Sequence, residues 1–293
     1  MANAALPAPE HVSFASLDRD AAGAPVTISA LYFRPPGAAP DAKVPLIIAA
    51  HGCGGMFSVR ADRDNELSER FATWTGQLLS DGYAVLWPDS FNPRGRRSVC
   101  LVKRGEATIL PATRRLDILG ALGYAAALPG VDRARIALVG WSHGGSTTLA
   151  AINGKDPRIA EFHAAPGAPP PFRVAVAFYP GCVVSLRAGD KWQPGMPAAI
   201  HIGALDDWTP APSCVKLGDS ARARGALMTV TVYPGAYHGF DAPRGKVTVW
   251  KEVTTGASPD KGVTIGPNAA ARAAAKDAVR ALLRERMAPS AAP

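Results

Sequence analysis

The sequence of 293 residues lacks the features that define several large classes of protein. No apolar run approaches the roughly 18 residues of a membrane-spanning helix, so we expect no membrane partner. No internal repeat and no Ser/Gly-rich linker interrupts the chain, which favours a single domain over residues 1–293 rather than two small ones. We expect its core between about residues 26 and 285, with flexible ends at 1–10 and 288–293.

The chain has little concentration of charge of one sign beyond a basic excess near residues 94–104 and in the C-terminal helix. The net charge of +8 comes from 32 basic and 24 acidic residues, and the rest of the basic excess is scattered. Because aromatic residues are not interleaved with the basic ones, as a platform for single-stranded nucleic acid needs, we expect no nucleic-acid partner. General surface charge is the first interpretation, and attraction of an anionic substrate is the second.

Signals of cellular location are equally sparse. The N-terminus has no charged segment followed by an apolar one, although residues 2–4 read Ala-Asn-Ala and resemble a cleavage site. The location stays open: cytoplasmic for the sequence as written, periplasmic or secreted if a signal peptide was removed before Ala4. Four cysteines permit three disulfide pairings in an oxidising compartment or four free thiols in a cytosolic one: Cys53, Cys100, Cys182 and Cys214.

Apolar patterns of two periods alternate along the chain. Strands are predicted at 11–17, 26–33, 45–50, 83–88, 136–139, 173–180, 197–203 and 227–233. Helices are predicted at 66–80, at 113–128 with Thr113 as cap, after residue 142, after Thr209, and at 268–287. The first two strands form an antiparallel pair, and the rest predict a doubly wound, mostly parallel sheet with helices on both faces. Residues 164–171 form a surface connection, and 247–250 is either an edge strand or a lid.

Residues 135–146 combine a buried strand, a sharp turn and the start of a helix. The turn reads Gly-Trp-Ser-His-Gly at 140–144, a G-x-S-x-G nucleophile elbow with Ser142 at its tip. Such a turn lifts a hydroxyl above the sheet and aims the first N–H of the helix, that of His143, at the same point. The plain alternative is a strand-to-helix turn with a capping serine.

A second glycine-rich turn follows the strand at 45–50. It reads His-Gly-Cys-Gly-Gly at 51–55, and we assign to the N–H of Cys53 the second donor to an oxyanion. Glycine also punctuates ordinary strand ends, so a simple turn is the alternative.

A serine needs a base and a third group to orient that base. His238 lies in a loop beyond the strand at 227–233 and is the best base, whereas His201 lies inside a strand. The acid is expected from the preceding strand-end loop, where Asp206 and Asp207 are neighbours. We favour Asp206, which comes first after the strand and leaves Asp207 to cap the next helix.

The long polar segment at 89–100 is expected to lie over the site and help to select the substrate. Within it, Arg94 and Arg97 are candidates to meet a carboxylate, although we favour the interpretation that they are solvated loop residues. Three aromatic residues complete the expected substrate contacts: Trp141, Trp208 and Tyr237.

The chain resembles the dienelactone hydrolase family of the α/β-hydrolase superfamily. The resemblance covers residues 44–240 and is carried by the motifs at 51–55, 140–145, 203–206 and 233–240, the last reading Tyr-Pro-Gly-Ala-Tyr-His-Gly-Phe. It implies an α/β-hydrolase fold and hydrolysis of an ester or lactone without metal or organic cofactor. Ser142, Asp206 and His238 match the family's triad positions, and its Gly-x-x-Asp spacing points to Asp206.

Two departures bear on the substrate. Enzymes that act on dienelactone itself share a cysteine nucleophile and a His-Glu turn. At the matching positions this chain has Ser142 and His51-Gly52. With Trp141 before the serine, the chain is also similar to carboxylesterases and polyester-cleaving, cutinase-like enzymes.

We therefore predict a serine hydrolase of small esters or lactones that acts through an acyl-enzyme on Ser142. An acyltransferase or perhydrolase with the same triad, and a non-catalytic binding protein on this scaffold, are the alternatives. The expected partner is a small-molecule substrate, and the chain is expected to be a monomer or homodimer.

Overall fold

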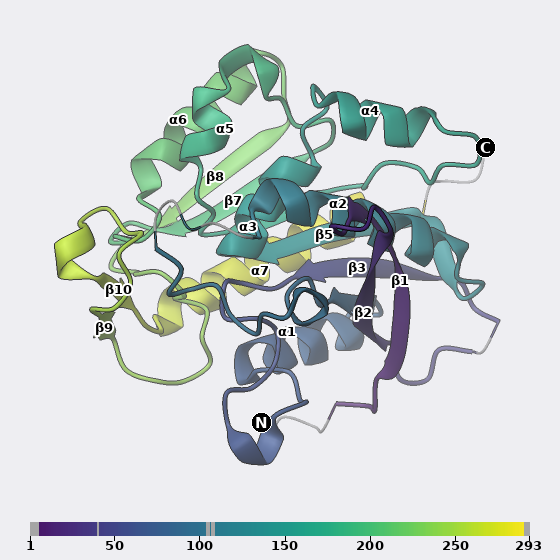
Figure 1. Cartoon of the computed structure of the whole chain (residues 1–293), viewed down its shortest axis with the longest axis horizontal. Helices are drawn as coiled ribbons and strands as arrows, with labels where there is room; N and C mark the ends of the chain where they lie inside the picture. The colour runs from purple at the N-terminus through teal and green to yellow at the C-terminus, as the bar shows by residue number, and fades with distance from the viewer. Residues whose placement is uncertain (1–5, 40, 104–105, 107–108, 290–293) are drawn as a thin grey trace.

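An eight-stranded sheet forms the centre of the molecule (Figure 1), in the order β1-β2-β4-β3-β5-β6-β7-β8. This computed structural model describes residues 6–289 apart from 40, 104–105 and 107–108. The strands are β1 Glu10–Arg19, β2 Pro25–Phe33, β3 Val44–Ala50, β4 Ala84–Pro88, β5 Val131–Trp141, β6 Ala175–Phe178, β7 Ala198–Gly203 and β8 Met228–Tyr233. β2 pairs antiparallel with β1 and β4, and the remaining pairs are parallel. The predicted α/β-hydrolase architecture is confirmed.

Helices cover both faces of the sheet. They are α1 Glu69–Ser80, α2 Pro111–Ala127, α3 His143–Ala151, α4 Pro157–Ala164, α5 Val183–Arg187, α6 Ala211–Ala223 and α7 Ala269–Arg286, with short 3-10 turns at η1 Ala61–Arg63, η2 Asn92–Arg94, η3 Gly189–Lys191 and η4 Pro259–Lys261. Successive side chains of β5 point to opposite faces of the sheet. A Cβ at Gly140 would collide with Thr148 of α3, whereas Trp141 packs against Trp74 of α1, and Lys276 of α7 lies over the same Trp74 ring.

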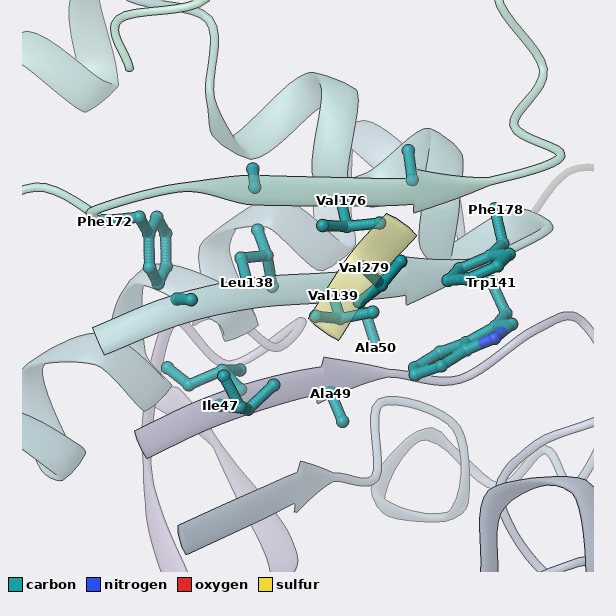
Figure 2. Packing of buried hydrophobic residues seen from close by; sticks show 14 of the residues in the cluster. Ile47, Ala49, Ala50, Leu138, Val139, Trp141, Phe172, Val176, Phe178 and Val279 are labelled. Atoms are coloured by element: carbon teal, nitrogen blue, oxygen red, sulfur yellow. The ribbon is translucent and has the colours of Figure 1, made fainter. Parts of the chain in front are cut away.

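The central strands are apolar on both faces, as parallel strands covered by helices must be. Figure 2 shows β3, β5 and β6 side by side, with α7 behind them, and Val139 of β5 and Val279 of α7 both belong to the core. The rings of Trp141 and Phe178 stack at the carboxyl ends of β5 and β6, 5.6 Å apart. This rigid edge supports the loops that carry the polar residues discussed below.

Several boundaries differ from those predicted. α2 begins at Pro111 after Leu110, not at a Thr113 cap, because proline presets the backbone angle of a first helical turn. α4 was not predicted; it begins after Asp156, whose side chain accepts the N–H of Arg158. The core was expected to begin at about residue 26, but it already includes Phe14 of β1.

The segment expected at 247–250 lies outside the main sheet. It is β9 Thr248–Trp250, which pairs antiparallel with β10 Val263–Ile265 in a separate ribbon. The expectations for residues 1–5, including the Ala-Asn-Ala sequence, and for 290–293 fall outside the described residues. In the part of the chain that the structure describes, no helix is long and apolar enough to span a bilayer.

Acid should destabilise the fold partly through His201 of β7. This side chain is 3% exposed and lies 2.8 Å, Nδ1 to hydroxyl oxygen, from Tyr233. Burial lowers the pKa of His201 from 6.5 to about 4, so the unfolded chain binds one more proton between these values. The free energy of unfolding that neutral His201 contributes is therefore fully present above pH 6.5 and is lost as the pH falls towards 4.

We expect the urea midpoint of the wild type to fall between pH 7 and about pH 4.5, and His201→Gln to reduce that fall. Glutamine can exchange either kind of hydrogen bond with Tyr233 but does not titrate. His11→Gln, at an exposed position of β1, is the control. The same pH dependence in wild type and His201→Gln would contradict the prediction.

Candidate active site

Ser142 stands between the end of β5 and the first turn of α3, with a positive φ of 54°. The flanking glycines permit this turn because the backbone of neighbouring segments comes very close. A Cβ at Gly144 would lie 2.5 Å from the carbonyl oxygen of His51 and would also overlap that of Ala50. The G-x-S-x-G pattern is thus a steric requirement of the contact between α3 and the loop after β3.

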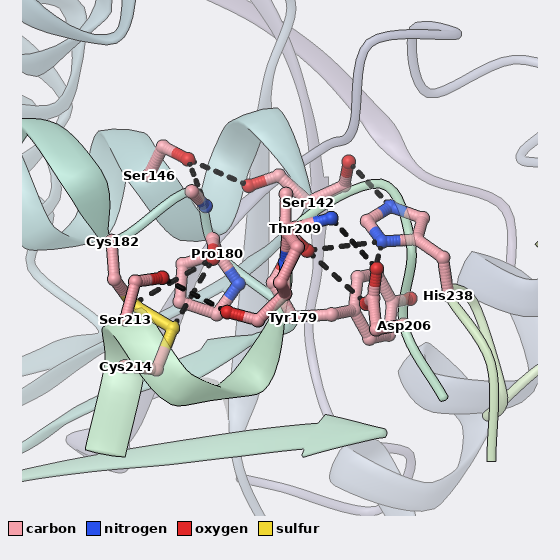
Figure 3. Close-up of a disulfide and its surroundings, with 12 residues drawn as sticks. Ser142, Ser146, Tyr179, Pro180, Cys182, Asp206, Thr209, Ser213, Cys214 and His238 are labelled. Carbon is pink, nitrogen blue, oxygen red and sulfur yellow. Dashed lines mark hydrogen bonds and ion pairs between the residues drawn. A yellow bond between two sulfur atoms is a disulfide. The ribbon is translucent and has the colours of Figure 1, made fainter. Parts of the chain in front are cut away.

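The structure brings Ser142, His238 and Asp206 together at the carboxyl ends of β5, β8 and β7 (Figure 3). His238 Nε2 lies 2.9 Å from Ser142 Oγ, and its Nδ1 lies 2.9 Å from Asp206 Oδ2. Because the carboxylate accepts a hydrogen bond from Nδ1–H, Nε2 is left without a proton and can accept that of the serine. His238 and Asp206 are 3% and 4% exposed, which keeps water from competing for these bonds.

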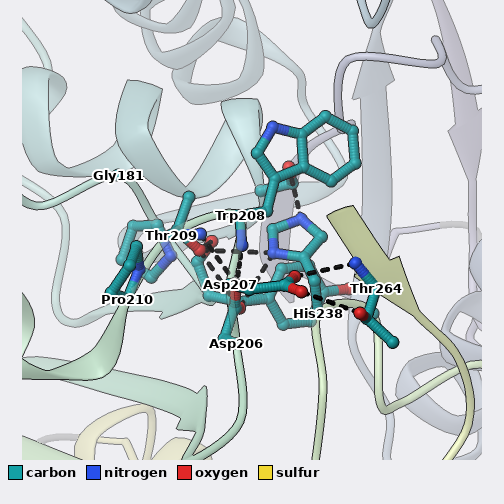
Figure 4. Close-up of polar contacts among 12 residues, drawn as sticks. Gly181, Asp206, Asp207, Trp208, Thr209, Pro210, His238 and Thr264 are labelled. Carbon is teal, nitrogen blue, oxygen red and sulfur yellow. Dashed lines mark hydrogen bonds and ion pairs between the residues drawn. The ribbon is translucent and has the colours of Figure 1, made fainter. Parts of the chain in front are cut away.

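The two neighbouring aspartates point to different partners (Figure 4). Asp206 Oδ1 also accepts the N–H groups of Trp208 and Thr209, at 3.0 and 2.7 Å. Asp207 accepts the N–H and the hydroxyl of Thr264 in β10, both at 2.7 Å. The expectation that Asp207 caps the next helix is wrong: it binds the β9-β10 ribbon, and α6 begins later, after Pro210.

Two backbone N–H groups are available near Ser142. That of His143 opens α3 and so has no partner within the helix. That of Cys53 has no backbone acceptor among the described residues, and an added Cβ on the preceding Gly52 would lie 3.5 Å from Ser142 Cβ. The arrangement fits the pair of donors predicted from the sequence.

Ser142 opens into a cavity of about 340 Å³. Its wall consists of Cys53, Val99, Cys100, Val102, Lys103, Ile109, Leu110, Pro111, Ser142, His143, Ser146, Trp208, Thr209 and Thr255. The surface is mostly apolar, and Trp208 stands beside the His238 ring with 4.8 Å between ring centroids. A larger hollow of about 710 Å³ near Asn153 and Arg224 is lined mainly by charged and amide residues and does not include Ser142.

Neither Arg94 nor Arg97 is placed to meet a substrate carboxylate, and the exposed Arg97 fits the interpretation as a solvated loop residue. Arg94 is mostly buried and binds Asp117 at 2.8 and 3.0 Å and Asp18 at 2.7 Å, so it is not a solvated loop residue either. Arg97 binds Asp64 and donates to the carbonyl of Ser58. Acceptors of the chain itself already occupy both guanidinium groups, and both lie outside the described cavity wall.

Of the three aromatic residues expected to contact substrate, Trp208 lies in the cavity wall. Trp141 is fully buried in the core, where its Nε1–H donates to Asp241 at 2.9 Å. Its position before the serine therefore supports the elbow from behind instead of meeting a substrate. Tyr237 is half-buried and lies outside the described wall.

Sequence reasoning missed a buried group behind His238. The Tyr179 hydroxyl donates to Asp241 Oδ1 at 2.7 Å, and Trp74 and Trp141 donate to Oδ2 at 2.8 and 2.9 Å. Tyr179 has a φ of 36°, and its ring centroid lies 4.5 Å from that of His238. An acidic residue three places after the histidine was the available signal for Asp241.

Thr209 is a second residue that the sequence did not single out. Its hydroxyl lies 3.1 Å from Asp206 Oδ2 and 3.2 Å from His238 Nδ1, and it donates to the carbonyl of Tyr179 at 3.1 Å. Thr209 therefore fills the space beside the carboxylate–imidazole pair and fixes both to the end of β6.

Disulfides join Cys53 to Cys100 and Cys182 to Cys214. Of the two alternatives left open by the sequence, the structure has the bridges; the first joins two loops, and the second joins the residue before α5 to Cys214 within α6. The first bridge forms part of the cavity wall. Among the described residues, no group of three or more histidine, cysteine or acidic side chains is placed to hold a metal ion.

The strand order, the serine at a strained turn and the buried histidine and aspartate behind it define an α/β-hydrolase. The sequence model of the dienelactone hydrolase family matches residues 28–286, and the chain belongs to that family. It is a hydrolase of the dienelactone hydrolase family with serine, not cysteine, at the elbow.

Solved structures share the fold at low sequence identity. A dienelactone hydrolase of Klebsiella pneumoniae superposes with a TM-score of 0.63 and 17% identity, over 95% of this chain and 100% of that one. Thermogutta terrifontis esterase 2, phosphorylated by paraoxon, superposes with a TM-score of 0.62 and 16% identity over 97% of each chain. Pyrococcus horikoshii acylaminoacyl peptidase superposes with a TM-score of 0.60 and 15% identity, over 97% of this chain and 42% of that one.

Among curated proteins, a dipeptidyl-aminopeptidase B of Grosmannia clavigera is 33% identical over 120 residues. The match covers 40% of this chain and 11% of that protein. The chain therefore spans a small part of this relative, and the relative's peptidase activity does not transfer to it.

Proposed function

We propose that this hydrolase cleaves carboxylic ester or lactone bonds through an acyl-enzyme on Ser142. The observation that carries the proposal is the unbroken hydrogen-bond path from Asp206 through His238 to the Ser142 hydroxyl. That path gives a weakly nucleophilic serine a base, and gives the base a fixed tautomer. The family supports hydrolysis, and the choice of ester or lactone over amide is our proposal.

In the proposed mechanism, Ser142 Oγ attacks the carbonyl carbon while His238 Nε2 takes its proton. The negative charge that develops on the carbonyl oxygen is held by the N–H groups of His143 and Cys53. His238 returns the proton to the leaving alcohol, and Asp206 stabilises the transient imidazolium. Water then attacks the acyl-enzyme with His238 again as base.

The cavity supports a substrate with an apolar group next to its carbonyl. Val99, Val102, Ile109 and Leu110 form one side, and Trp208 stands beside His238. A cavity of about 340 Å³ with a mostly apolar wall suits a small or medium-sized acyl or alcohol group.

The test is hydrolysis of p-nitrophenyl esters from acetyl to dodecanoyl, with the matching p-nitroanilides as amide controls. We expect ester hydrolysis with an optimum within the series, much slower amide hydrolysis, and covalent labelling of Ser142 by paraoxon, located by peptide mass spectrometry. Added alcohol or peroxide separates hydrolase from acyltransferase or perhydrolase by whether it outcompetes water. If the protein hydrolysed none of the esters and paraoxon did not label Ser142, the proposal would be refuted.

A further inference from the structure

Arg114 of α2 is a fully buried cation next to the two N–H groups assigned to the oxyanion. Its Nη1 donates to the carbonyl oxygen of His51 and to Nδ1 of His143, each at 2.9 Å. His51 lies two residues before Cys53, and His143 carries the other N–H. One guanidinium group thus joins the loop after β3 to the first residue of α3, where Gly144 already packs against His51 without room for a side chain.

The contact fixes the protonation of His143. A guanidinium only donates, so Nδ1 of His143 must accept and the imidazole must carry its proton on Nε2. Burial first, and then the charge of Arg114, lower the pKa of His143 to about 3 and hold that of His51 well below its ordinary range. Both imidazoles are therefore neutral at neutral pH, and Arg114 supplies the positive charge of this cluster.

This charge has no direct counterion. All 24 Asp and Glu residues of the chain lie in its described part, and none forms an ion pair with Arg114 there. Nε and Nη2 of Arg114 are buried without a hydrogen-bond partner among the described residues. The acid one turn along α2, Asp117, is bound instead by Arg94 and Ser16. Burial lowers the pKa of Arg114 to about 10, which leaves it charged at neutral pH.

We propose that Arg114 is a positioning residue for the oxyanion hole, and that its charge, which no direct ion pair neutralises, stabilises the negative charge of the tetrahedral intermediate. This inference rests on the proposed function. A buried cation without a counterion carries a desolvation cost in the resting enzyme, and a nearby oxyanion offsets that cost only when it forms. Such an interaction is stronger in the transition state than in the bound substrate, so it lowers the barrier without tightening substrate binding.

The test compares Arg114→Met and Arg114→Gln with wild type and with Arg115→Met. Methionine removes charge and donors, whereas glutamine keeps an N–H donor without charge. Arg115 is the next residue of α2 and pairs with Asp156 instead, so its variant is the matched control. The measurements are kcat and KM on the best p-nitrophenyl ester, the thermal unfolding midpoint, and inhibition by an aryl trifluoromethyl ketone. That ketone adds Ser142 Oγ reversibly and places an oxyanion in the site.

We expect both Arg114 variants to lower kcat about 10- to 100-fold while KM stays within about twofold of wild type. The affinity for the ketone should fall by the same factor as kcat. Their unfolding midpoints should stay close to that of wild type, because relief of the desolvation cost of the charge is offset by the loss of the donors to His51 and His143. Arg115→Met should keep the kcat and ketone affinity of wild type.

A folded Arg114→Met that keeps wild-type kcat, or loses kcat with unchanged ketone affinity, would overturn the inference. If Arg114→Met does not fold, Arg114→Gln decides by the same criteria. A purely structural role predicts the opposite pattern, in which stability falls and the folded fraction keeps full activity. Failure of the proposed function is distinct, because wild type itself would then neither hydrolyse esters nor be labelled at Ser142.

Discussion

Replacing Ser142 with alanine is expected to lower kcat for ester hydrolysis by about 10⁵- to 10⁶-fold, the scale of loss when a triad nucleophile is removed. The substitution deletes the oxygen that lies 2.9 Å from His238 Nε2. It leaves a Cβ at the strained turn, so the backbone at φ 54° is under the same strain in both proteins. We therefore expect the far-ultraviolet circular dichroism and the unfolding midpoint to stay close to those of wild type.

Ser146 provides a control one helical turn away. Its hydroxyl also faces the cavity, but it lies 3.3 Å from the carbonyl of Ser142 and accepts the N–H of Gly181 at 2.8 Å. Ser146→Ala should keep kcat within about tenfold of wild type, since it disturbs only local support. If Ser142→Ala retained more activity than Ser146→Ala, the nucleophile would have to be sought elsewhere.

The second large effect is expected at Asp206. Asp206→Asn keeps the size of the side chain but can present an N–H to His238 Nδ1, which then favours the tautomer with its proton on Nε2. That tautomer cannot accept the proton of Ser142, and the expected loss in kcat is about 10⁴-fold. Steady-state kcat of Asp206→Asn and wild type on the same p-nitrophenyl ester measures this loss.

Asp207→Asn is the matched comparison for this variant. Asp207 binds Thr264 in β10, so its loss should loosen the β9-β10 ribbon and change kcat only severalfold. A larger loss of kcat in Asp207→Asn than in Asp206→Asn would transfer the role of the acid to the second aspartate.

The local parts of the site were predictable from the sequence. An elbow is specified by a few adjacent residues: an apolar strand, glycines on both sides of Ser142, and a helix that follows. The loops of Asp206 and His238 could be located because each follows a predicted strand, and parallel strands present their carboxyl ends at one edge of the sheet.

The arginines show where such reasoning fails. Arg94 and Arg97 were candidate ligands or solvated loop residues because they lie in a long polar loop, yet they bind Asp117 and Asp64. Nothing in the sequence singled out Arg114, yet it reaches His143, 29 residues further along the chain. Whether a cation is paired, solvated or buried depends on contacts between distant segments, which neither composition nor periodicity encodes.

The same reason hid Asp241, whose donors lie 62 to 167 residues away in the sequence. A single aspartate near the end of a motif has many plausible partners. The structure supplies Trp74, Trp141 and Tyr179 from three different elements. Such a convergence becomes visible only after the fold is known.

The bridge from Cys53 to Cys100 bears on how the protein is produced for any of these assays. It spans 47 residues and joins the turn that carries one oxyanion donor to a loop of the cavity wall. A host that keeps thiols reduced would deliver chains with the same sheet and triad but without this covalent link. Specific activities can therefore be compared between preparations only after thiol titration has shown that all four cysteines are oxidised.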